Sequence, residues 1–483
     1  MKPVRSILIC GAALAPLVAA PARADDLREA LALAYRTNPT IEVARANQRA
    51  IDESEPIARA AGLPSLAGTA SYTEFLKKSA NSFTSPDRAL DIQSTLNIPV
   101  FSGGAVKNSI RAAETRIEAG QTDLRGTESG LFSQVVTAYM DVIQNEAIVG
   151  LSANNVQVLG VNSQATRDRF QIGDLTRTDV AQSQSRQAIA QGNLQVARAN
   201  LANARERYIQ LVGKAPIRLQ PPPPLPGLPA SADDAVAIAL ENNPDLIAAH
   251  TRTKAAGFDT DVAGAGRLPR VSVFIGPDYT NYLGTLGGSS VPAGTFRQQQ
   301  LTAQAGVRAT IPIFQGGLPA AQQRQAQARE GAALEQEIGV ERQVIATVRS
   351  AYSSWRAATE TIATNQTAVD AATLSLEGVR AENTVGNRTI LDILNAEQEA
   401  LNAQLQLVTA RRNAYVAGFN LLSAMGKAEA DDLGLDGGPL YDPEVNHRRV
   451  RRKISDWSRD PDPVAHSTRT VDTPSQTGAV VGP

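Results

Sequence analysis

The second half of this sequence repeats the first at a nearly constant offset. Leu63-Pro64 recurs as Leu268-Pro269. Ile98-Pro99-Val100-Phe101 recurs as Ile311-Pro312-Ile313-Phe314, where the offset between the halves is eight residues larger. A repeat of this length predicts two like units, each burying an apolar face against the other. The chain is therefore expected to fold as an internal duplication.

Prolines between positions 221 and 226 separate the halves and predict a stiff, extended spacer. We divide the chain into a first repeat at 25–214, a proline-rich linker at 215–231 and a second repeat at 232–427. A C-terminal extension follows at 428–483.

The first residues have the features of a secretory signal peptide. Lys2 and Arg5 precede an apolar run, which ends before Ala22-Arg23-Ala24, a small-x-small cleavage site. The alternative is a retained membrane anchor, for which the apolar run is short. We expect residues 1–24 to be removed, which makes this an exported protein. Because Cys10 is the only cysteine, the mature chain has none and forms no disulfide.

Each repeat shows the same order of patterns: a moderate helix, two short strands and two very long helices. In the first repeat the expected ranges are 27–61 for the moderate helix, 65–76 and 90–101 for the strands, and 104–171 and 175–212 for the long helices. In the second repeat they are 232–264, 271–282 and 301–313, and 318–384 and 389–425, in the same order.

The long helices have a seven-residue apolar rhythm. Ile110, Ile117, Leu124 and Leu131 are spaced by seven, as are Leu394 and Leu401. A sustained period of seven makes helices wrap around one another in a left-handed sense. A helix of nearly seventy residues extends roughly 100 Å, so these helices are expected to form a rod or tube rather than a globular core.

The short strands alternate between apolar and polar residues. Leu301, Ala303 and Ala305 alternate with Thr302 and Gln304. Alternation over about ten residues is typical of an outer-membrane strand, but water-soluble hairpins alternate equally well. Four strands cannot close a barrel, and lipid does not tolerate an open sheet edge. If these strands span a membrane, several copies of the chain must join.

The ordered motifs resemble those of the TolC family. They are Asn-Pro near the start of each half, Ile-Pro-hydrophobic-Phe-x-Gly-Gly at each strand-to-helix junction, and Gly-Asn-Arg-Thr-Ile-Leu-Asp-Ile-Leu-Asn-Ala at 386–396. The resemblance covers about residues 25 to 440. It implies a mainly α fold with a β-barrel contribution, in which each protomer of a homotrimer gives four transmembrane β-strands to one barrel in outer-membrane lipid. The coiled-coil-like helices would form a trimeric α-helical tunnel in the periplasm.

The same resemblance implies a channel constriction at Asp392 and Asn395. Asp392 matches an aspartate that points into the tunnel mouth, where symmetry copies form a ring. Asn395 replaces the acidic residue of a second ring, so that ring is neutral here. Three carboxylates at a narrow mouth would attract cations, and their mutual repulsion would raise their pKa.

The resemblance also implies closed-state contacts between the two helix tips of one protomer. Arg388 matches the arginine of this network and Thr178 its threonine partner. Asp179 matches an aspartate whose usual tyrosine partner is Asn383 here, which predicts a weaker latch. Without the family context, Arg388 and Asp392 could be only a surface ion pair, four residues apart.

Six tip residues match positions where an adaptor protein docks in the family. They are Ile172, Gly173, Asp174, Val385, Gly386 and Asn387. The two glycines would also let the chain reverse between helices.

No pattern for catalysis or cofactor binding is present in the sequence. The three histidines lie far apart and lack ligand-like neighbours. No phosphate-binding Gly-x-x-x-x-Gly-Lys loop or nucleophile elbow occurs, and a net charge of −1 gives no argument for nucleic acid. We expect a conduit rather than an enzyme, without cofactor or metal, which takes energy from a partner.

One strongly basic run, at 447–453, lies in the C-terminal extension. It could touch anionic lipid or peptidoglycan, or be a solvated tail. The polar residues after it have little to bury, which predicts a largely disordered tail.

The patterns and the resemblance together predict a trimeric outer-membrane channel, the exit duct of a tripartite export system for type I protein secretion, multidrug efflux or both. A periplasmic adaptor and an inner-membrane ABC or proton-driven pump would open its helix tips. The alternative is a soluble periplasmic coiled-coil scaffold. A secreted hydrolase would need a catalytic constellation, and the sequence contains none.

Overall fold

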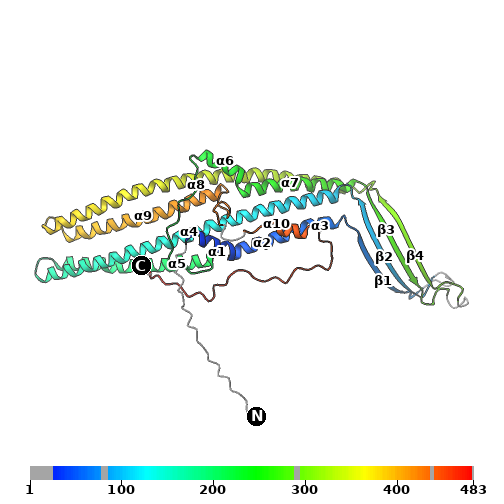
Figure 1. Ribbon diagram of the computed structural model, residues 1–483, viewed down its shortest axis with the longest axis horizontal. Helices are drawn as coiled ribbons and strands as arrows, with labels where there is room; N and C mark the ends of the chain where they lie inside the picture. Colours follow the sequence, from blue (N-terminus) through cyan, green and yellow to red (C-terminus); the bar gives the residue numbers. More distant parts are fainter. Residues whose placement is uncertain (1–25, 78–84, 288–293, 436–439, 481–483) are drawn as a thin grey trace, which may run out of the picture.

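The computed structural model describes residues 26–77, 85–287, 294–435 and 440–480. The expected signal peptide at 1–24 lies outside the described residues. Long helices form an elongated body, and a small sheet stands at one end of it, as Figure 1 shows. The fold is thus mainly helical with one separate sheet.

Four long helices form two hairpins, one from each repeat. In the first hairpin, α4 (Ala105–Gln171) is followed by α5 (Arg177–Val212). In the second, α8 (Leu318–Thr384) is followed by α9 (Ile390–Ala424). Among the described residues, no helix is both long and apolar enough to cross a membrane.

The Asn-Pro motif breaks the moderate helix of each repeat, where one uninterrupted helix was expected. The first repeat has α1 (Leu27–Thr37), α2 (Pro39–Asp52) and α3 (Ser54–Ala60), and the second has α6 (Ala232–Asn242) and α7 (Pro244–Gly264), with a 3₁₀ turn at Ala265–Arg267. Asn38 caps the helix that begins at Pro39, and Asn243 caps the helix that begins at Pro244.

The amide side chains of these two asparagines also join distant segments. Nδ2 of Asn38 donates to the carbonyl of Leu211, near the end of α5, at 2.8 Å. Nδ2 of Asn243 donates to the carbonyl of Ala424, at the end of α9, at 2.9 Å. The duplicated motif therefore fixes the same junction in both repeats.

The sheet contains two strands from each repeat, antiparallel and in the order β1-β2-β3-β4. Their bounds are Ser65–Glu74 for β1, Arg88–Phe101 for β2, Arg270–Asn281 for β3 and Gln299–Thr310 for β4. The repeats are joined in the middle, where β2 pairs with β3. The outer edges of β1 and β4 pair with no other strand of the described chain.

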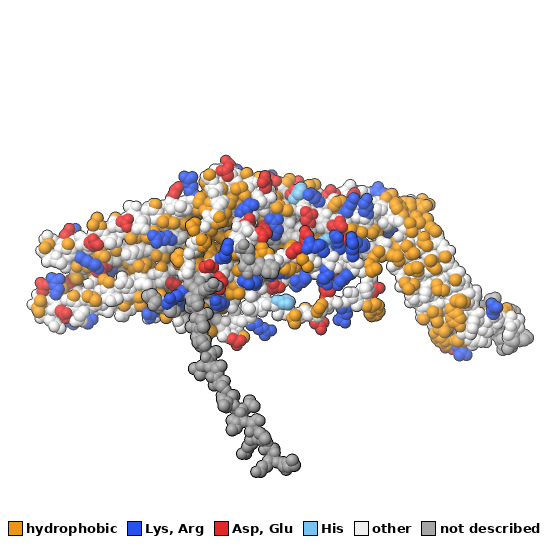
Figure 2. Space-filling view, in the orientation of Figure 1, with side chains coloured by type: hydrophobic (Ala, Val, Ile, Leu, Met, Phe, Trp, Pro, Cys, Tyr) orange, Lys and Arg blue, Asp and Glu red, His pale blue; other side chains and the backbone are white. Residues whose placement is uncertain are grey.

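One face of this sheet is apolar across all four strands. Leu66 pairs with Leu96, Leu96 with Ile275, and Ile275 with Ala305, so these side chains share a face. The opposite face carries polar residues, for example Asp91, whose carboxylate accepts from the Thr280 hydroxyl at 2.7 Å. Figure 2 shows hydrophobic side chains gathered over the strands, whereas charged side chains gather on the helical body.

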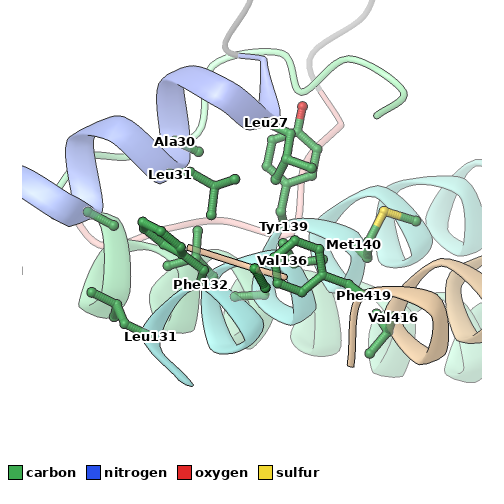
Figure 3. Close-up of a cluster of buried hydrophobic side chains, with 14 of the residues drawn as sticks. Leu27, Ala30, Leu31, Leu131, Phe132, Val136, Tyr139, Met140, Val416 and Phe419 are labelled. Atoms are coloured by element: carbon green, nitrogen blue, oxygen red, sulfur yellow. The ribbon is translucent and has the colours of Figure 1, made fainter. Parts of the chain in front are cut away.

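The largest apolar core lies where the helical body is thickest. Side chains of α1, α4 and α9 interdigitate there, including Leu31, Phe132, Tyr139 and Phe419 (Figure 3). The Tyr139 hydroxyl donates to the linker carbonyl of Gln220 at 2.7 Å. Its counterpart in the second repeat, Tyr352, donates to Ala230 at 2.8 Å. The linker is therefore held against the core by equivalent tyrosines.

The C-terminal extension, expected to be a largely disordered tail, contacts helices of the first repeat over part of its length. Residues 440–480, here called the strap, lie along the first repeat and include a short helix, α10 (Glu444–Val450). Arg45 lies between two tyrosine rings, 4.4 Å from the centroid of Tyr35 and 4.8 Å from that of Tyr441. Contacts with side chains of the first repeat thus hold this part of the strap against the helices.

Glu128 of α4 makes stability depend on pH. Its carboxylate accepts a hydrogen bond from the backbone N–H of Ala430, and burial raises its pKa to about 7. The native state therefore binds this proton more tightly than the unfolded chain does. Stability falls as pH rises from the ordinary glutamate pKa through the native value, and the whole penalty is present above it.

We expect Glu128→Gln to stabilise the protein at pH 8 by on the order of 2–3 kcal/mol and to have little effect near pH 4.5. Glutamine keeps an acceptor for Ala430 but carries no charge. Thermal unfolding of both proteins at the two pH values measures this difference. An equal shift at both values would mean that the Glu128 charge is not responsible.

Candidate functional site: the paired helix tips

The two hairpins reverse direction in equivalent turns, at residues 172–176 (tip 1) and 385–389 (tip 2). In tip 1, Gly173 has φ +84° and the N–H of Asp174 donates to the carbonyl of Arg169 at 3.0 Å. In tip 2, Gly386 has φ +83° and the N–H of Asn387 donates to Glu382, also at 3.0 Å. This is the Schellman ending of a helix, which favours glycine because of its positive φ.

Each returning helix begins with a capping box. Thr176 and Asp179 exchange hydrogen bonds at the start of α5, and Thr389 and Asp392 do the same at the start of α9. Hydrogen bonds from Thr389 lower the pKa of the Asp392 carboxyl. Within one chain the helix start thus favours the charged carboxylate, and the expected rise from neighbouring copies stays a prediction. Asp392 is therefore ionised near neutral pH.

The expected contact between Arg388 and Thr178 is absent from the described residues. Arg388 instead pairs with Glu382 of its own hairpin at 2.7 Å, and Nδ2 of Asn383 donates to the Arg388 carbonyl at 2.7 Å. Tip 1 has a corresponding pair, Arg169 with Asp174, at 2.8 Å. These contacts stabilise each turn, and because each of them lies within one hairpin, none of them connects the two tips.

The predicted adaptor-docking residues lie at the free ends of the hairpins, away from the sheet (Figure 1). Ile172 is 80% exposed and Val385 is 71% exposed. Each tip thus presents one apolar side chain beside a glycine at the extreme end of the molecule.

Of the hydrogen-bonded contacts between the hairpins in the described residues, those nearest to the tips lie at a set of residues of which the sequence indicated only Leu394 and Asn395. We call this set the seam; it comprises Leu159, Asn162, Arg186, Ala190, Arg380, Leu394, Asn395 and Glu397.

Glu397 of α9 is the central polar residue of the seam. Nδ2 of Asn162, on α4, donates to Oε1 of Glu397 at 2.7 Å, and Arg380, on α8, pairs with the same oxygen at 3.0 Å. Glu397 is only 6% exposed. It therefore links three of the four long helices. Its position three residues after Leu394, where the heptad pattern favours an apolar side chain, is the one sequence signal that could have revealed it.

Two further contacts cross between the hairpins beside Glu397. Asn395, expected at the channel constriction, accepts a hydrogen bond from Arg186 of α5 at 3.0 Å. Leu394 packs in a buried cluster with Leu159 and Ala190. The seam thus combines apolar packing with hydrogen bonds to a buried charge.

The described ranges show no candidate metal site. They contain no group of three or more His, Asp or Glu residues placed to hold a metal ion. His250 pairs with Glu337 at 2.8 Å, and His447 pairs with Glu55 at 2.5 Å.

We expect Thr389→Ala to loosen tip 2 without opening the seam. Loss of an N-cap costs about 1 kcal/mol, so the amide of Asp392 should exchange with solvent about fivefold faster. Hydrogen exchange measured by mass spectrometry tests this. The matched control is Thr178→Ala, since that hydroxyl caps no helix. Equal exchange in both variants would show that the capping box does not hold the tip.

A profile of the outer membrane efflux protein family matches residues 30–214 and 235–427. The chain is 34% identical over 432 residues to outer membrane efflux protein BepC of Brucella suis biovar 1, covering 89% of this chain and 92% of that protein. It is 28% identical over 427 residues to outer membrane protein TolC of Escherichia coli K12, covering 85% and 84%.

The Campylobacter jejuni CmeC outer membrane channel has the same fold. Its crystal structure superposes with a TM-score of 0.72 at 15% identity and covers 88% of this chain and 89% of that one. The family profile matches both repeats separately, and together the two matches span most of the sequence. The chain therefore belongs to the outer membrane efflux protein family, whose members are channels of the outer membrane rather than enzymes.

Proposed function

We propose that three copies of this chain form one export duct through the outer membrane, with a shared barrel of twelve strands. Two features of the sheet support the shared barrel. Its outer strands β1 and β4 have free edges, and its apolar face is covered by no described helix. In lipid, free edges must be paired. Pairing of β1 with β4 of the next copy satisfies every edge and turns the apolar face towards lipid.

The long hairpins would then form a periplasmic tunnel that is closed near the seam. Asp392 would face the tunnel mouth from the first turn of α9, where a ring of ionised carboxylates favours cations. The neutral Asn395 is tied to Arg186, so it adds no second acidic ring. Opening requires the two hairpins of each chain to separate at Glu397.

Two kinds of partner would act with this duct. The exposed apolar tips, Ile172 and Val385, would meet the hairpin of a periplasmic adaptor. An inner-membrane ABC or proton-driven pump would supply the energy. Exported proteins, small toxic molecules or both would pass through such a duct.

Planar-bilayer recording of the purified protein tests this function. The duct predicts discrete channels of small conductance. A soluble periplasmic scaffold would be recovered in osmotic-shock fluid, and the folded protein would give no channels.

A further inference from the structure

The strap makes a U-turn on the surface of the first repeat. From its start it runs towards the sheet: Tyr441 contacts Arg45, Asn446 donates to Asp52 at 2.7 Å, and His447 meets Glu55 of α3. The next segment of the chain after α3 is β1. This half of the strap therefore points towards the strands.

The second half of the strap runs back. The N–H of Gln476 donates to Glu206 of α5 at 2.8 Å, and Arg205 donates to the carbonyl of Thr477 at 2.7 Å. The bend between the two halves is the part of the strap nearest the sheet, and Figure 1 shows it beside the end of α3.

Ion pairs close the base of this bend. Arg449 forms two hydrogen bonds of 2.7 Å with the carboxylate of Asp460, and Lys453 lies 3.2 Å from it. The hydrogen bond from Arg449, aided by Lys453, lowers the pKa of Asp460. Residues 450–459 thus form a loop that is held at both ends.

The loop exposes apolar side chains that cost free energy in water. Trp457 is 93% exposed and Ile454 is 77% exposed. Three arginines flank them and form no ion pair within the described parts of the chain: Arg451, Arg452 and Arg459. The only acidic residue between positions 451 and 459 is Asp456.

Tryptophan beside arginine is typical of a membrane–water interface. The indole ring is amphipathic and favours the headgroup level, and arginine is attracted to anionic headgroups. Peptidoglycan offers anionic groups but no apolar phase for Trp457 and Ile454. A phospholipid surface satisfies both the apolar and the basic side chains.

We infer that the loop at 450–459 anchors the helical body to the periplasmic leaflet of the outer membrane. Ile454 and Trp457 enter the leaflet, and Arg451, Arg452 and Arg459 contact anionic phospholipid headgroups. This inference rests on the proposed duct, because the barrel brings that leaflet to the sheet end of the body.

Fluorescence quenching of the full-length protein in vesicles tests the anchor. The chain has two tryptophans, so Trp355→Phe leaves Trp457 as the only reporter. Trp355 packs against Tyr352 in the helical body, which makes Trp457→Phe the matched control. The vesicles contain phosphatidylethanolamine and phosphatidylglycerol, with or without lipid brominated near the headgroup. We expect Trp457 to be quenched several-fold more strongly than Trp355.

A second pair of variants separates the basic residues from the apolar ones. In the Trp355→Phe background, Arg451→Gln with Arg452→Gln should reduce the quenching, as should replacing phosphatidylglycerol with phosphatidylcholine. Equal quenching of the two tryptophans would overturn the anchor, as would a Trp457 response that appears only with soluble peptidoglycan or an adaptor hairpin.

Vesicle flotation distinguishes the two proposals. If the protein floats with the vesicles and conducts but Trp457 is not quenched, only the anchor is wrong. If the protein does not insert, the duct is wrong and the anchor with it.

Discussion

Replacing Glu397 with alanine should raise the single-channel conductance several-fold. Glu397 holds Asn162 of the other hairpin and Arg380 of its own, and its side chain is buried. Its removal leaves the Asn162 amide without its acceptor, which costs about 1–3 kcal/mol. Arg380 also loses its ion pair with Glu397, but because its side chain is half-exposed, water compensates part of this loss. The total cost should therefore lie at the lower end of the range of about 1–3 kcal/mol. Three equivalent losses in a trimer would shift the hairpins towards separation.

The control for this variant is Glu399→Ala. Glu399 lies on the same helix and carries the same charge, but it is exposed. Glu399→Ala should leave the conductance unchanged. Arg388→Ser should also leave it unchanged, since Arg388 pairs within its own hairpin. If the conductance rises in Arg388→Ser but not in Glu397→Ala, the contacts that keep the channel closed lie at the tips and not at the seam.

Replacing Ala305 with lysine should prevent stable assembly in the membrane. Ala305 lies at the middle of β4 on the apolar face, opposite Ile275. A lysine on the lipid side near the middle of a barrel costs about 2–4 kcal/mol per chain. We expect the heat-resistant oligomer in the outer-membrane fraction to be strongly reduced, as measured by electrophoresis without boiling.

Gln304→Lys is the matched control, one residue away on the same strand. Gln304 pairs with Gly276 on the polar face, where a charge would lie in water within the lumen. This variant should assemble normally. Equal loss in both variants would mean that the apolar face does not contact lipid.

The sequence predicted the mainly helical fold with a small sheet because its signals are local and periodic. A seven-residue rhythm and period-two alternation each specify one kind of element. The break at Asn38-Pro39 was missed, although an asparagine cap before proline is itself a helix-start signal. The contacts of the strap are not predictable from local patterns, because its partners, such as Asp52 and Glu55, lie far away in sequence.

The candidate site depends more than the fold does on contacts between residues that are distant in sequence. The capping boxes use residues only three apart, so the pairing of Thr389 with Asp392 is a local signal that the sequence already contains. The place of Asp392 at a constriction depends on neighbouring copies and stays a prediction. Glu397 was missed because its role depends on how two hairpins pack together, which no local pattern encodes. The pairing of Arg388 with Thr178 rests on the resemblance, whereas in this chain the Arg388 guanidinium pairs with the carboxylate of Glu382 in the same hairpin.

The most direct test of the shared barrel is a structure of the reconstituted protein by electron cryo-microscopy. We expect three chains around one axis, with β1 of each chain hydrogen-bonded to β4 of the next in a closed barrel of twelve strands. A particle in which the edges of β1 and β4 stay unpaired, or in which the apolar face of the sheet packs against protein instead of lipid, would contradict it.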